Sequence, residues 1–320
     1  MISVVIPYYQ REPGILRRAL ASIAAQRDCP LPIHVIVVDD ASPAPVAPEI
    51  ATAPEMPWAV QVIHQPNAGP GAARNAGLDQ LPADTRYVAF LDSDDEWAPN
   101  HLARAVFALQ AGFDFYFADL LQLGAQVTAF SRAGRIVPSQ HQPIAGVHDG
   151  LYAYRGDMLD QTIRGNVIGT PTVVYDAKRF ADKRFEVALT SAGEDYLFWM
   201  DIAAAGARIA FSSQCEVKCG RGVNIYAGAG WGTEAHLRRI HDEVQFRKLM
   251  LRRYKLTKTQ VAHVDAGIGR LRIAFARDLL HRLSHRKHLP SRLLLSHLTL
   301  DPLSFLMLLP NSTRLLLKWV

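Results

Sequence analysis

The sequence predicts an α/β protein with a mixed, mostly parallel sheet flanked by helices and a helical extension at its C-terminal end. The first 121 residues alternate short apolar runs with amphipathic segments, a rhythm that builds parallel strands joined by helices. The apolar runs are bounded and have the length of buried strands. Several of them end in aromatic or acidic side chains, where open parallel sheets bind their ligands.

The expected elements follow from this pattern in chain order. The strand candidates are residues 2–7, 34–40, 59–65, 86–92, 113–121 and 170–176. The helix candidates are residues 14–26, 69–81 and 100–112. The segment 41–57, rich in Pro and Ala, predicts a loop, and 122–170 shows no clear period. Residues 191–211 predict a helix that ends at Gly206 and then a strand, and the pattern from residue 234 onward is helical.

Composition indicates a globular protein with one large domain and an appendage. The chain has 320 residues, of which 49% are hydrophobic and 20% charged. Its three cysteines (Cys29, Cys215 and Cys219) form no metal-finger pattern, and we expect free thiols. A strand-like run directly follows Met1 without a basic segment, which is unlike a secretory signal. We therefore expect a cytoplasmic protein.

Charge is distributed unevenly along the chain. Residues 1–235 carry 18 Lys and Arg against 25 Asp and Glu, whereas residues 236–320 carry 17 against 5. No run in the basic region reaches about 18 apolar residues, so a membrane-spanning helix is not expected there. The basic segments beside apolar ones suit helices lying on an anionic membrane surface, or a packed helical cap with a solvated basic face. No recognition motif accompanies the charge, so no nucleic-acid partner is expected.

Three carboxylates lie at and just after the end of the fourth strand candidate, within the segment VAFLDSDDE. Asp92, Asp94 and Asp95 occupy four consecutive positions together with Ser93. In a poorly solvated cleft, three such charges repel one another by several kcal/mol unless a cation lies among them. Oxygen ligands without nearby Cys or paired His favour Mg²⁺ or Mn²⁺. A solvated acidic turn before a helix is the alternative.

The ends of the other strand candidates strengthen the first interpretation. The first strand ends at Pro7-Tyr8-Tyr9 and the second at Asp39-Asp40. In a parallel sheet these ends share one edge with the acidic segment, so aromatic rings and five carboxylates would surround one cleft. A nucleoside diphosphate bound with a divalent metal accounts for that combination, whereas a purely structural sheet does not.

The series VVIPYYQRE, VVDDAS, GPGAARNAG, FLDSDD and GEDYLFW resembles glycosyltransferase family 2, whose members are inverting nucleotide-sugar transferases. Within that family the chain is most similar to bacterial exopolysaccharide glucosyltransferases of the succinoglycan type. The resemblance implies a GT-A fold, in which a Rossmann-like sheet binds the donor. It covers about residues 1–235, with a nucleotide-sugar-binding half (1–120) and an acceptor-binding half (121–235), followed by the basic helical region 236–320.

The same resemblance assigns donor-binding residues. Pro7 and Tyr9 match the positions that pack against the base and ribose, and Asp40 matches the carboxylate that accepts the uracil imide hydrogen. Arg74 matches an arginine at the start of the helix after the glycine turn, where cations suit phosphate. An Asx-type turn at Asp39 and Asp40, and a surface position for Arg74, are the alternatives.

The acidic segment matches the family's DxD signature. Asp92 and Ser93 are expected to contact the donor, and one of Asp94 and Asp95 to bind Mn²⁺ or Mg²⁺ directly. Such a metal would neutralise the departing diphosphate. The sequence alone does not show which of the three aspartates binds the metal and which contact the donor.

The GED turn supplies the expected catalytic carboxylates. Asp195 matches the general base that removes the acceptor proton, and Glu194 is expected to orient the acceptor or the loop. Acids at a helix N-terminus also stabilise the helix dipole, which is the structural alternative. One base with a metal-held leaving group implies direct displacement, since retention through a covalent intermediate would need a second carboxylate.

We therefore expect an inverting, metal-dependent transferase that moves a hexose, with glucose as the leading candidate, from a UDP-sugar to a hydroxyl. The expected acceptor is a growing, lipid-linked exopolysaccharide or cell-surface glycan at the inner face of the cell membrane. Two alternatives remain: a nucleotidyltransferase acting on a sugar phosphate, and a non-catalytic nucleotide-sugar-binding subunit of a membrane assembly. The glycine-rich stretch 220–236 predicts either a lid over the donor or an ordinary loop.

Overall fold

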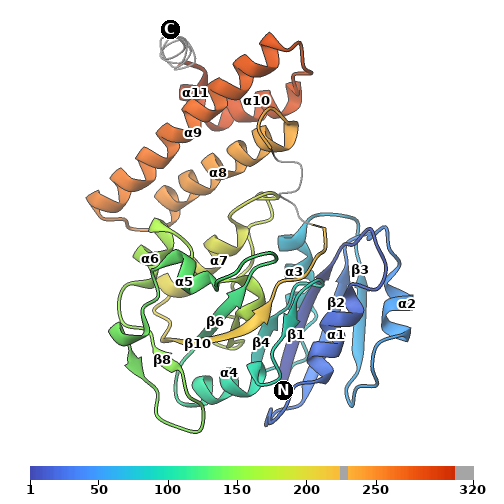
Figure 1. The fold of residues 1–320 in the computed structure, drawn as a ribbon. Helices are drawn as coiled ribbons and strands as arrows, with labels where there is room; N and C mark the ends of the chain where they lie inside the picture. The colour runs from blue at the N-terminus through green and yellow to red at the C-terminus, as the bar shows by residue number, and fades with distance from the viewer. Residues whose placement is uncertain (224–229, 307–320) are drawn as a thin grey trace. The chain divides into compact units, whose positions relative to one another are not determined.

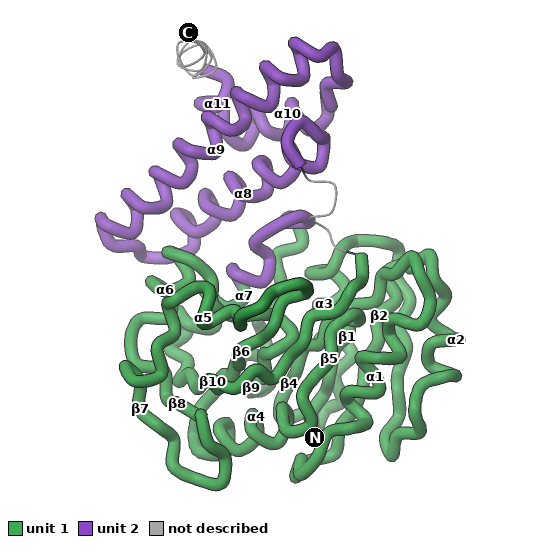
Figure 2. Tube along the Cα trace, in the orientation of Figure 1, with its two compact units in different colours: residues 1–187, 198–223 green, residues 188–197, 224–320 purple. Residues whose placement is uncertain are grey.

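The computed structural model describes residues 1–223 and 230–306, and its fold is drawn in Figure 1. The chain divides into two compact units (Figure 2). Unit 1 consists of Met1–Val187 and Phe198–Val223, and unit 2 consists of Ala188–Leu197 and Asn224–Val320. The ten residues 188–197 therefore group with the C-terminal helices, although they lie inside the expected catalytic domain 1–235. The assignment of that domain and of its two halves stays a prediction.

Unit 1 is built on a mixed sheet. Its strands are β1 (Ile2–Tyr8), β2 (Ile33–Asp39), β3 (Val60–His64), β4 (Tyr87–Phe90), β5 (Glu96–Trp97), β6 (Phe115–Leu121), β7 (Gln142–Pro143), β8 (Leu151–Ala153), β9 (Val174–Asp176) and β10 (Ile209–Lys218). They follow the order β3-β2-β1-β4-β9-β6-β10-β8-β7, with β5 paired to β10. The pairs among β3, β2, β1 and β4 are parallel, as is the pair of β6 with β10, while β9 is antiparallel to β4 and β6. The predicted mixed, mostly parallel sheet is confirmed.

Helices lie in the connections between these strands. They are α1 (Leu16–Ala24), α2 (Val46–Ala51), α3 (Pro70–Asp79), α4 (His101–Gln110), α5 (Ala129–Ala133), α6 (Met158–Arg164) and α7 (Glu194–Ala204), with 3₁₀ turns at Pro138–Gln140 and Thr170–Thr172. Helix α7 begins in unit 2 and continues in unit 1. Its end before Gly206, followed by strand β10, agrees with the prediction for residues 191–211.

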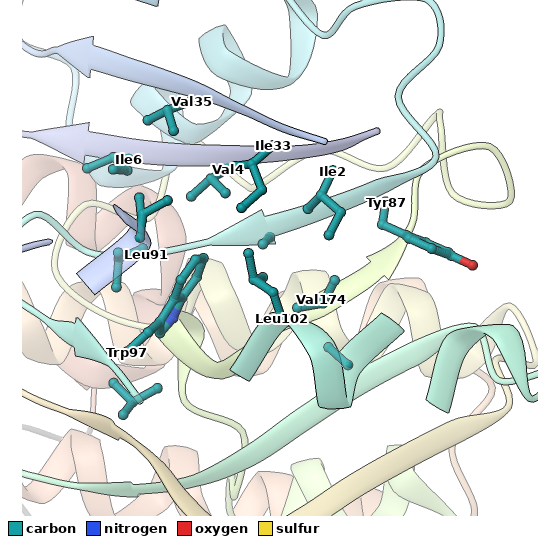
Figure 3. Close-up of a cluster of buried hydrophobic side chains, with 14 of the residues drawn as sticks. Ile2, Val4, Ile6, Ile33, Val35, Tyr87, Leu91, Trp97, Leu102 and Val174 are labelled. Atoms are coloured by element: carbon teal, nitrogen blue, oxygen red, sulfur yellow. The ribbon is translucent and has the colours of Figure 1, made fainter. Parts of the chain in front are cut away.

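The core of unit 1 lies on both faces of the central strands. In β1, alternate residues from Ile2 to Tyr8 belong to one cluster of buried side chains, and Val5 on the other face belongs to a second cluster, so the strand is covered on both faces. Figure 3 shows one of these clusters, to which β1 contributes Ile2, Val4 and Ile6. Burying each such side chain contributes about 1.5–3 kcal/mol. This rigid centre fixes the strand ends that carry the candidate site.

The structure corrects the prediction at two places. The segment 41–57 contains helix α2 in addition to loops. Val46 is buried, and Ile50, one turn later, packs against the same core, so the two side chains stabilise the helix. The predicted strand 170–176 is a 3₁₀ turn followed by the short strand β9, because Pro171 suits the start of a helical turn.

Unit 2 is helical in its described part. It contains α8 (Glu234–Arg253), α9 (Lys258–Ser284), α10 (Ser291–Leu300) and α11 (Pro302–Leu306), together with the first turn of α7. Buried side chains of α8, α9 and α10 form its core: Leu237, Ile240, Phe275, Leu279 and Leu293. Asp301 is fully buried and forms ion pairs with Arg272 and Lys248. Among the described residues, no helix has the length and hydropathy needed to cross a membrane.

Candidate functional site

The candidate donor site lies at the carboxyl ends of β1, β2 and β4. These strands are parallel neighbours, so their ends meet at one edge of the sheet. Tyr8 is paired with Asp39 at that edge, and the acidic segment follows directly after β4 and Leu91. Pro7 and Tyr9 are partly exposed, whereas Tyr8 between them is buried. The predicted convergence of these three strand ends is present in the structure.

The three aspartates of the acidic segment have different surroundings. Asp92 accepts a hydrogen bond from Arg74 Nη2 at 2.6 Å, and Asp95 accepts one from the Gly220 N–H at 3.0 Å. Burial and the nearby Asp92 charge raise the pKa of Asp94 to about 6. Burial, followed by repulsion from Asp92 and Asp94, raises the pKa of Asp95 well above its ordinary value. Asp95 is buried and Asp94 is half-buried, and a cation would stabilise both carboxylates in the ionised form.

Arg74 lies in helix α3 and points to the acidic segment. Its side chain is 5% exposed, so the alternative of a surface arginine is wrong. The guanidinium is paired with Asp92 and also lies over the Phe185 ring at 5.4 Å. The predicted contact between Arg74 and a phosphate stays a prediction. In this structure the arginine holds the first acid of the DxD segment in place.

Asp39 and Asp40 shape the neighbouring loops. Asp39 Oδ1 accepts from the Ser42 N–H at 2.8 Å, in the manner of the turn that the sequence offered as an alternative. The Asp40 carboxylate is buried and accepts from Gln65 Nε2 and from the N–H groups of Ala68 and Gly69. A carboxylate offers about four lone-pair sites. A uracil imide bound by Asp40, which stays a prediction, would therefore use the remaining one.

Gln10 also belongs to the candidate donor site, although no sequence motif indicated it. Its side-chain Nε2 donates to Ser93 Oγ at 3.0 Å, and its Oε1 accepts from the Val223 N–H at 2.9 Å. Its backbone N–H donates to Ser42 Oγ. Gln10, which lies in the segment after β1, is thus hydrogen-bonded to the segments that follow β2, β4 and β10. Only its place directly after the first strand could have indicated it.

Two glycines after β10 allow a close approach to Asp94. A Cβ atom added at Gly220 would lie 1.8 Å from the Asp94 carbonyl oxygen, and one at Gly222 would lie 2.6 Å from its carboxylate. Neither position tolerates a side chain while Asp94 stays in place. The sequence showed a glycine-rich stretch there, but its contact with the acidic segment depends on the fold. Residues 224–229 of the predicted lid lie outside the described residues.

The candidate catalytic acids lie in the first turn of α7, in unit 2. Glu194 is buried and Asp195 is partly exposed, and Asp195 Oδ1 accepts from the Tyr196 N–H at 2.8 Å. The following apolar residues are buried as expected of an internal helix: Leu197, Phe198, Met200 and Ile202. The helix geometry therefore agrees with the predicted GED turn, and the chemical roles of both acids stay predictions.

Comparison with known proteins identifies the family. The family model described as "Glycosyl transferase family 2" matches residues 3–168, which include β1 to β4 and the acidic segment. The succinoglycan biosynthesis protein ExoW of Rhizobium meliloti is 39% identical over 231 residues, covering 70% of each chain. The chain belongs to glycosyltransferase family 2. A second relative of this glycosyltransferase is the succinoglycan biosynthesis protein ExoO of the same organism. It is 28% identical over 216 residues, a match that covers 65% of this chain and 57% of ExoO.

Solved structures agree with the fold of the glycosyltransferase. Staphylococcus aureus TarS 1–349 in complex with UDP-GlcNAc matches 88% of this chain and 72% of its own, with a TM-score of 0.55 and 20% identity. The mannosyltransferase PcManGT from Pyrobaculum calidifontis, in complex with GDP-Man and Mn²⁺, matches 98% and 86%, with a TM-score of 0.53 and 19% identity. At these identities the comparisons support the predicted GT-A-like fold alone.

The chemistry of the acidic segment fits a divalent cation. Within residues 1–223 and 230–306, no group of three or more His, Cys, Asp and Glu side chains has the arrangement of a metal cage. Mg²⁺ and similar ions at phosphate-binding sites use one or two carboxylates, with waters and substrate phosphates as the other ligands. The half-buried Asp94 and the buried Asp95, both with raised pKa values, meet that smaller requirement.

Proposed function

We propose that this glycosyltransferase moves a hexose from a UDP-sugar to an acceptor hydroxyl with inversion at the anomeric carbon. The observation that carries the proposal is the group of buried carboxylates at the joined ends of β1, β2 and β4. Repulsion among these like charges destabilises the apo protein, and a cation bound together with a diphosphate would offset that repulsion. The partly exposed Pro7 and Tyr9 at the same edge offer surfaces for the base and ribose.

We propose a donor-binding role for each of these residues, and its surroundings support that role. Asp94 or Asp95 would hold Mn²⁺ or Mg²⁺, which when bound supplies positive charge to the departing diphosphate. Arg74 and Ser93 fix the acidic segment, since the first is paired with Asp92 and the second bonds Gln10. Asp40 would accept the uracil imide hydrogen. A preformed arrangement of this kind avoids reorganisation during the reaction.

The acceptor hydroxyl needs a group that removes its proton as the new bond forms. Asp195 takes that role in our proposal, and Glu194 orients the acceptor or the segment around it. Proton transfer to a carboxylate is favourable once bond formation has made the hydroxyl acidic. Direct displacement with a single base gives inversion, because the nucleophile attacks opposite the leaving diphosphate.

The similarity to two succinoglycan biosynthesis proteins favours an exopolysaccharide or another cell-surface glycan as the acceptor, in a lipid-linked form. UDP-glucose is the donor that we propose to test first. A nucleotidyltransferase would release pyrophosphate from a nucleoside triphosphate. A non-catalytic subunit would bind a nucleotide-sugar without turning it over.

A donor-hydrolysis screen tests this proposal and separates the alternatives. The purified protein is incubated with a panel of UDP-, GDP- and dTDP-sugars, or with a nucleoside triphosphate and a sugar phosphate, in Mn²⁺, Mg²⁺ or excess chelator. Released nucleoside diphosphate and pyrophosphate are measured. We expect UDP release from one UDP-hexose, with at least a tenfold loss in chelator because the leaving group loses its counter-ion. Equal release in chelator would contradict the metal role. Pyrophosphate release from a triphosphate, or binding without turnover, would support the alternatives instead.

We also propose that the C-terminal helices contact an anionic membrane surface. The described part of α10 and α11 exposes four leucines: Leu295, Leu298, Leu303 and Leu306. They belong to a region with 17 Lys and Arg against 5 Asp and Glu. Exposed apolar side chains and positive charge together suit the boundary of an anionic bilayer. The apolar segment 307–320 lies outside the described residues.

Liposome sedimentation measures this association. We expect the full chain to sediment with vesicles containing phosphatidylglycerol and to stay in solution with pure phosphatidylcholine vesicles. The charge contribution should weaken with added salt. Replacing Leu295 and Leu298 by Ser should reduce the bound fraction, whereas replacing the exposed Leu123 of unit 1 should leave it unchanged. Equal sedimentation with both vesicle types would contradict the proposal.

A further inference from the structure

The segment that carries the candidate base is attached to the C-terminal helical unit. Residues Ala188–Leu197 group with α8 to α11 rather than with the sheet from which their chain neighbours come. Each connection described below lies within unit 2. The attachment is specific, because three side chains of α8 and its C-cap contact it: Asp242, Phe246 and Tyr254.

Asp242 holds the loop that precedes α7. Its Oδ2 accepts from the Ser191 N–H at 2.7 Å, from the Thr190 N–H at 3.2 Å and from Thr190 Oγ1 at 3.4 Å. The carboxylate is 3% exposed, so these charge-assisted bonds are shielded from solvent. One carboxylate oxygen thereby accepts from two consecutive backbone donors, and it fixes the chain direction four to five residues before Asp195.

The next turn of α8 holds the residues beside the base. The Phe246 ring lies so close to Gly193 that a Cβ atom added there would be 2.8 Å from its Cγ, and Gly193 has φ +94°. The same ring makes an edge contact with Tyr196, with ring centroids 5.7 Å apart. Tyr254 Oη donates to the Leu197 carbonyl at 3.3 Å. Residues before and after Asp195 in the chain are thus both contacted by Phe246, and Leu197 is bonded by Tyr254.

The loop is not held by packing on every side. Thr190 and Asp242 also line a cavity of about 570 Å³, to which α8 and α10 contribute Arg238, His241 and Arg292. A loop bordering open space loses its orientation more easily than one packed in a core. The bonds to Asp242 therefore hold a loop that borders open space.

We propose that α8 is a positioning element for catalysis, in which Asp242 and Phe246 set the orientation of the turn that carries Asp195. The inference rests on the proposed role of Asp195 and extends it: the C-terminal helical unit orders the turn that carries the base, in addition to any membrane contact. Asp242 touches neither donor nor acceptor in this scheme. It acts through the backbone of residues 190 and 191, which sets the position of Asp195. A displacement of a catalytic base by about 1 Å is sufficient to slow proton transfer about a hundredfold.

The test compares Asp242→Asn with a matched control in the same unit. Asp242→Asn removes the charge that orders the loop, so we expect kcat for transfer to fall roughly ten- to a hundredfold. The donor KM and the affinity for UDP should not change. The control is Asp301→Asn, which is equally buried and pairs with Arg272 and Lys248 away from residues 188–197. It should lower thermal stability without lowering kcat of the folded enzyme.

A double-mutant cycle distinguishes this inference from the proposed function. If Asp242 acts through the base, Asp242→Asn should cost almost nothing further in kcat when Asp195 is already Asn. Equal fractional losses in both backgrounds, or wild-type kcat in folded Asp242→Asn, would overturn the positioning role. If Asp195→Asn itself keeps full activity, the proposed base is wrong. Should Asp242→Asn not fold, Phe246→Leu provides the same comparison, because it removes the ring contacts with Gly193 and Tyr196.

Discussion

Replacing Asp195 with Asn should reduce the transfer rate by about 10²- to 10⁴-fold, the usual contribution of a general base. Asn has nearly the same shape as Asp and can still accept a hydrogen bond from the Tyr196 N–H, so the first turn of α7 should keep its geometry. What the substitution removes is the ability to take a proton from the acceptor hydroxyl. The effect should therefore appear in kcat, while the affinity for UDP remains at the wild-type value.

The matched control for this substitution is Asp201→Asn. Asp201 lies in the second turn of the same helix, and the change has the same chemistry without altering the N-terminal turn. We expect wild-type kcat for it. Both variants are measured by steady-state transfer kinetics, with UDP affinity from calorimetry. An Asp195→Asn enzyme that transfers at the wild-type rate would exclude this residue as the base.

Replacing Asp94 with Asn should lower kcat/KM for the donor by about 10²- to 10³-fold, because several kcal/mol of leaving-group stabilisation depend on the metal. The same change should not reduce the thermal stability of the apo protein. Asp94 is half-buried beside Asp92 and Asp95, and repulsion among these carboxylates opposes folding when no cation is present. A loss of function without a loss of stability is the signature expected of a ligand-binding acid.

The control for Asp94→Asn is Asp182→Asn, which alters an exposed aspartate paired with Lys183. It should leave the donor kinetics unchanged. Thermal unfolding of the wild type and both variants is compared in chelator and in Mn²⁺ with UDP. If Asp94→Asn lowered the melting temperature in chelator and kept its donor kinetics, the acid would have a structural role.

The sequence was sufficient for the parallel strands β1, β2 and β4, because they are largely buried and read as continuous apolar runs. The convergence of Tyr8, Asp39 and the acidic segment followed from that topology. The short strands β5, β7 and β8 were not predicted, because runs of two or three residues carry no period. Helix α2 was missed because its Pro and Ala content is also typical of a loop.

Contacts between distant residues were beyond what the pattern could indicate. The sequence placed Arg74 at the start of a helix but could not show that its guanidinium pairs with Asp92. It marked Gly220 and Gly222 as part of a glycine-rich stretch, while the reason for glycine is the proximity of Asp94. Nor could it show that residues 188–197 group with helices more than 40 residues later, since that attachment depends on Asp242.

Mn²⁺ binding by the wild type in the presence and absence of UDP tests most directly whether the acidic segment holds a cation together with the donor's diphosphate. Electron paramagnetic resonance of free Mn²⁺ reports the bound fraction. We expect the wild type to bind Mn²⁺ much more tightly with UDP than without it, and Asp94→Asn to lose that difference. If UDP bound equally well in chelator and left Mn²⁺ affinity unchanged, the metal-assisted mechanism would be wrong.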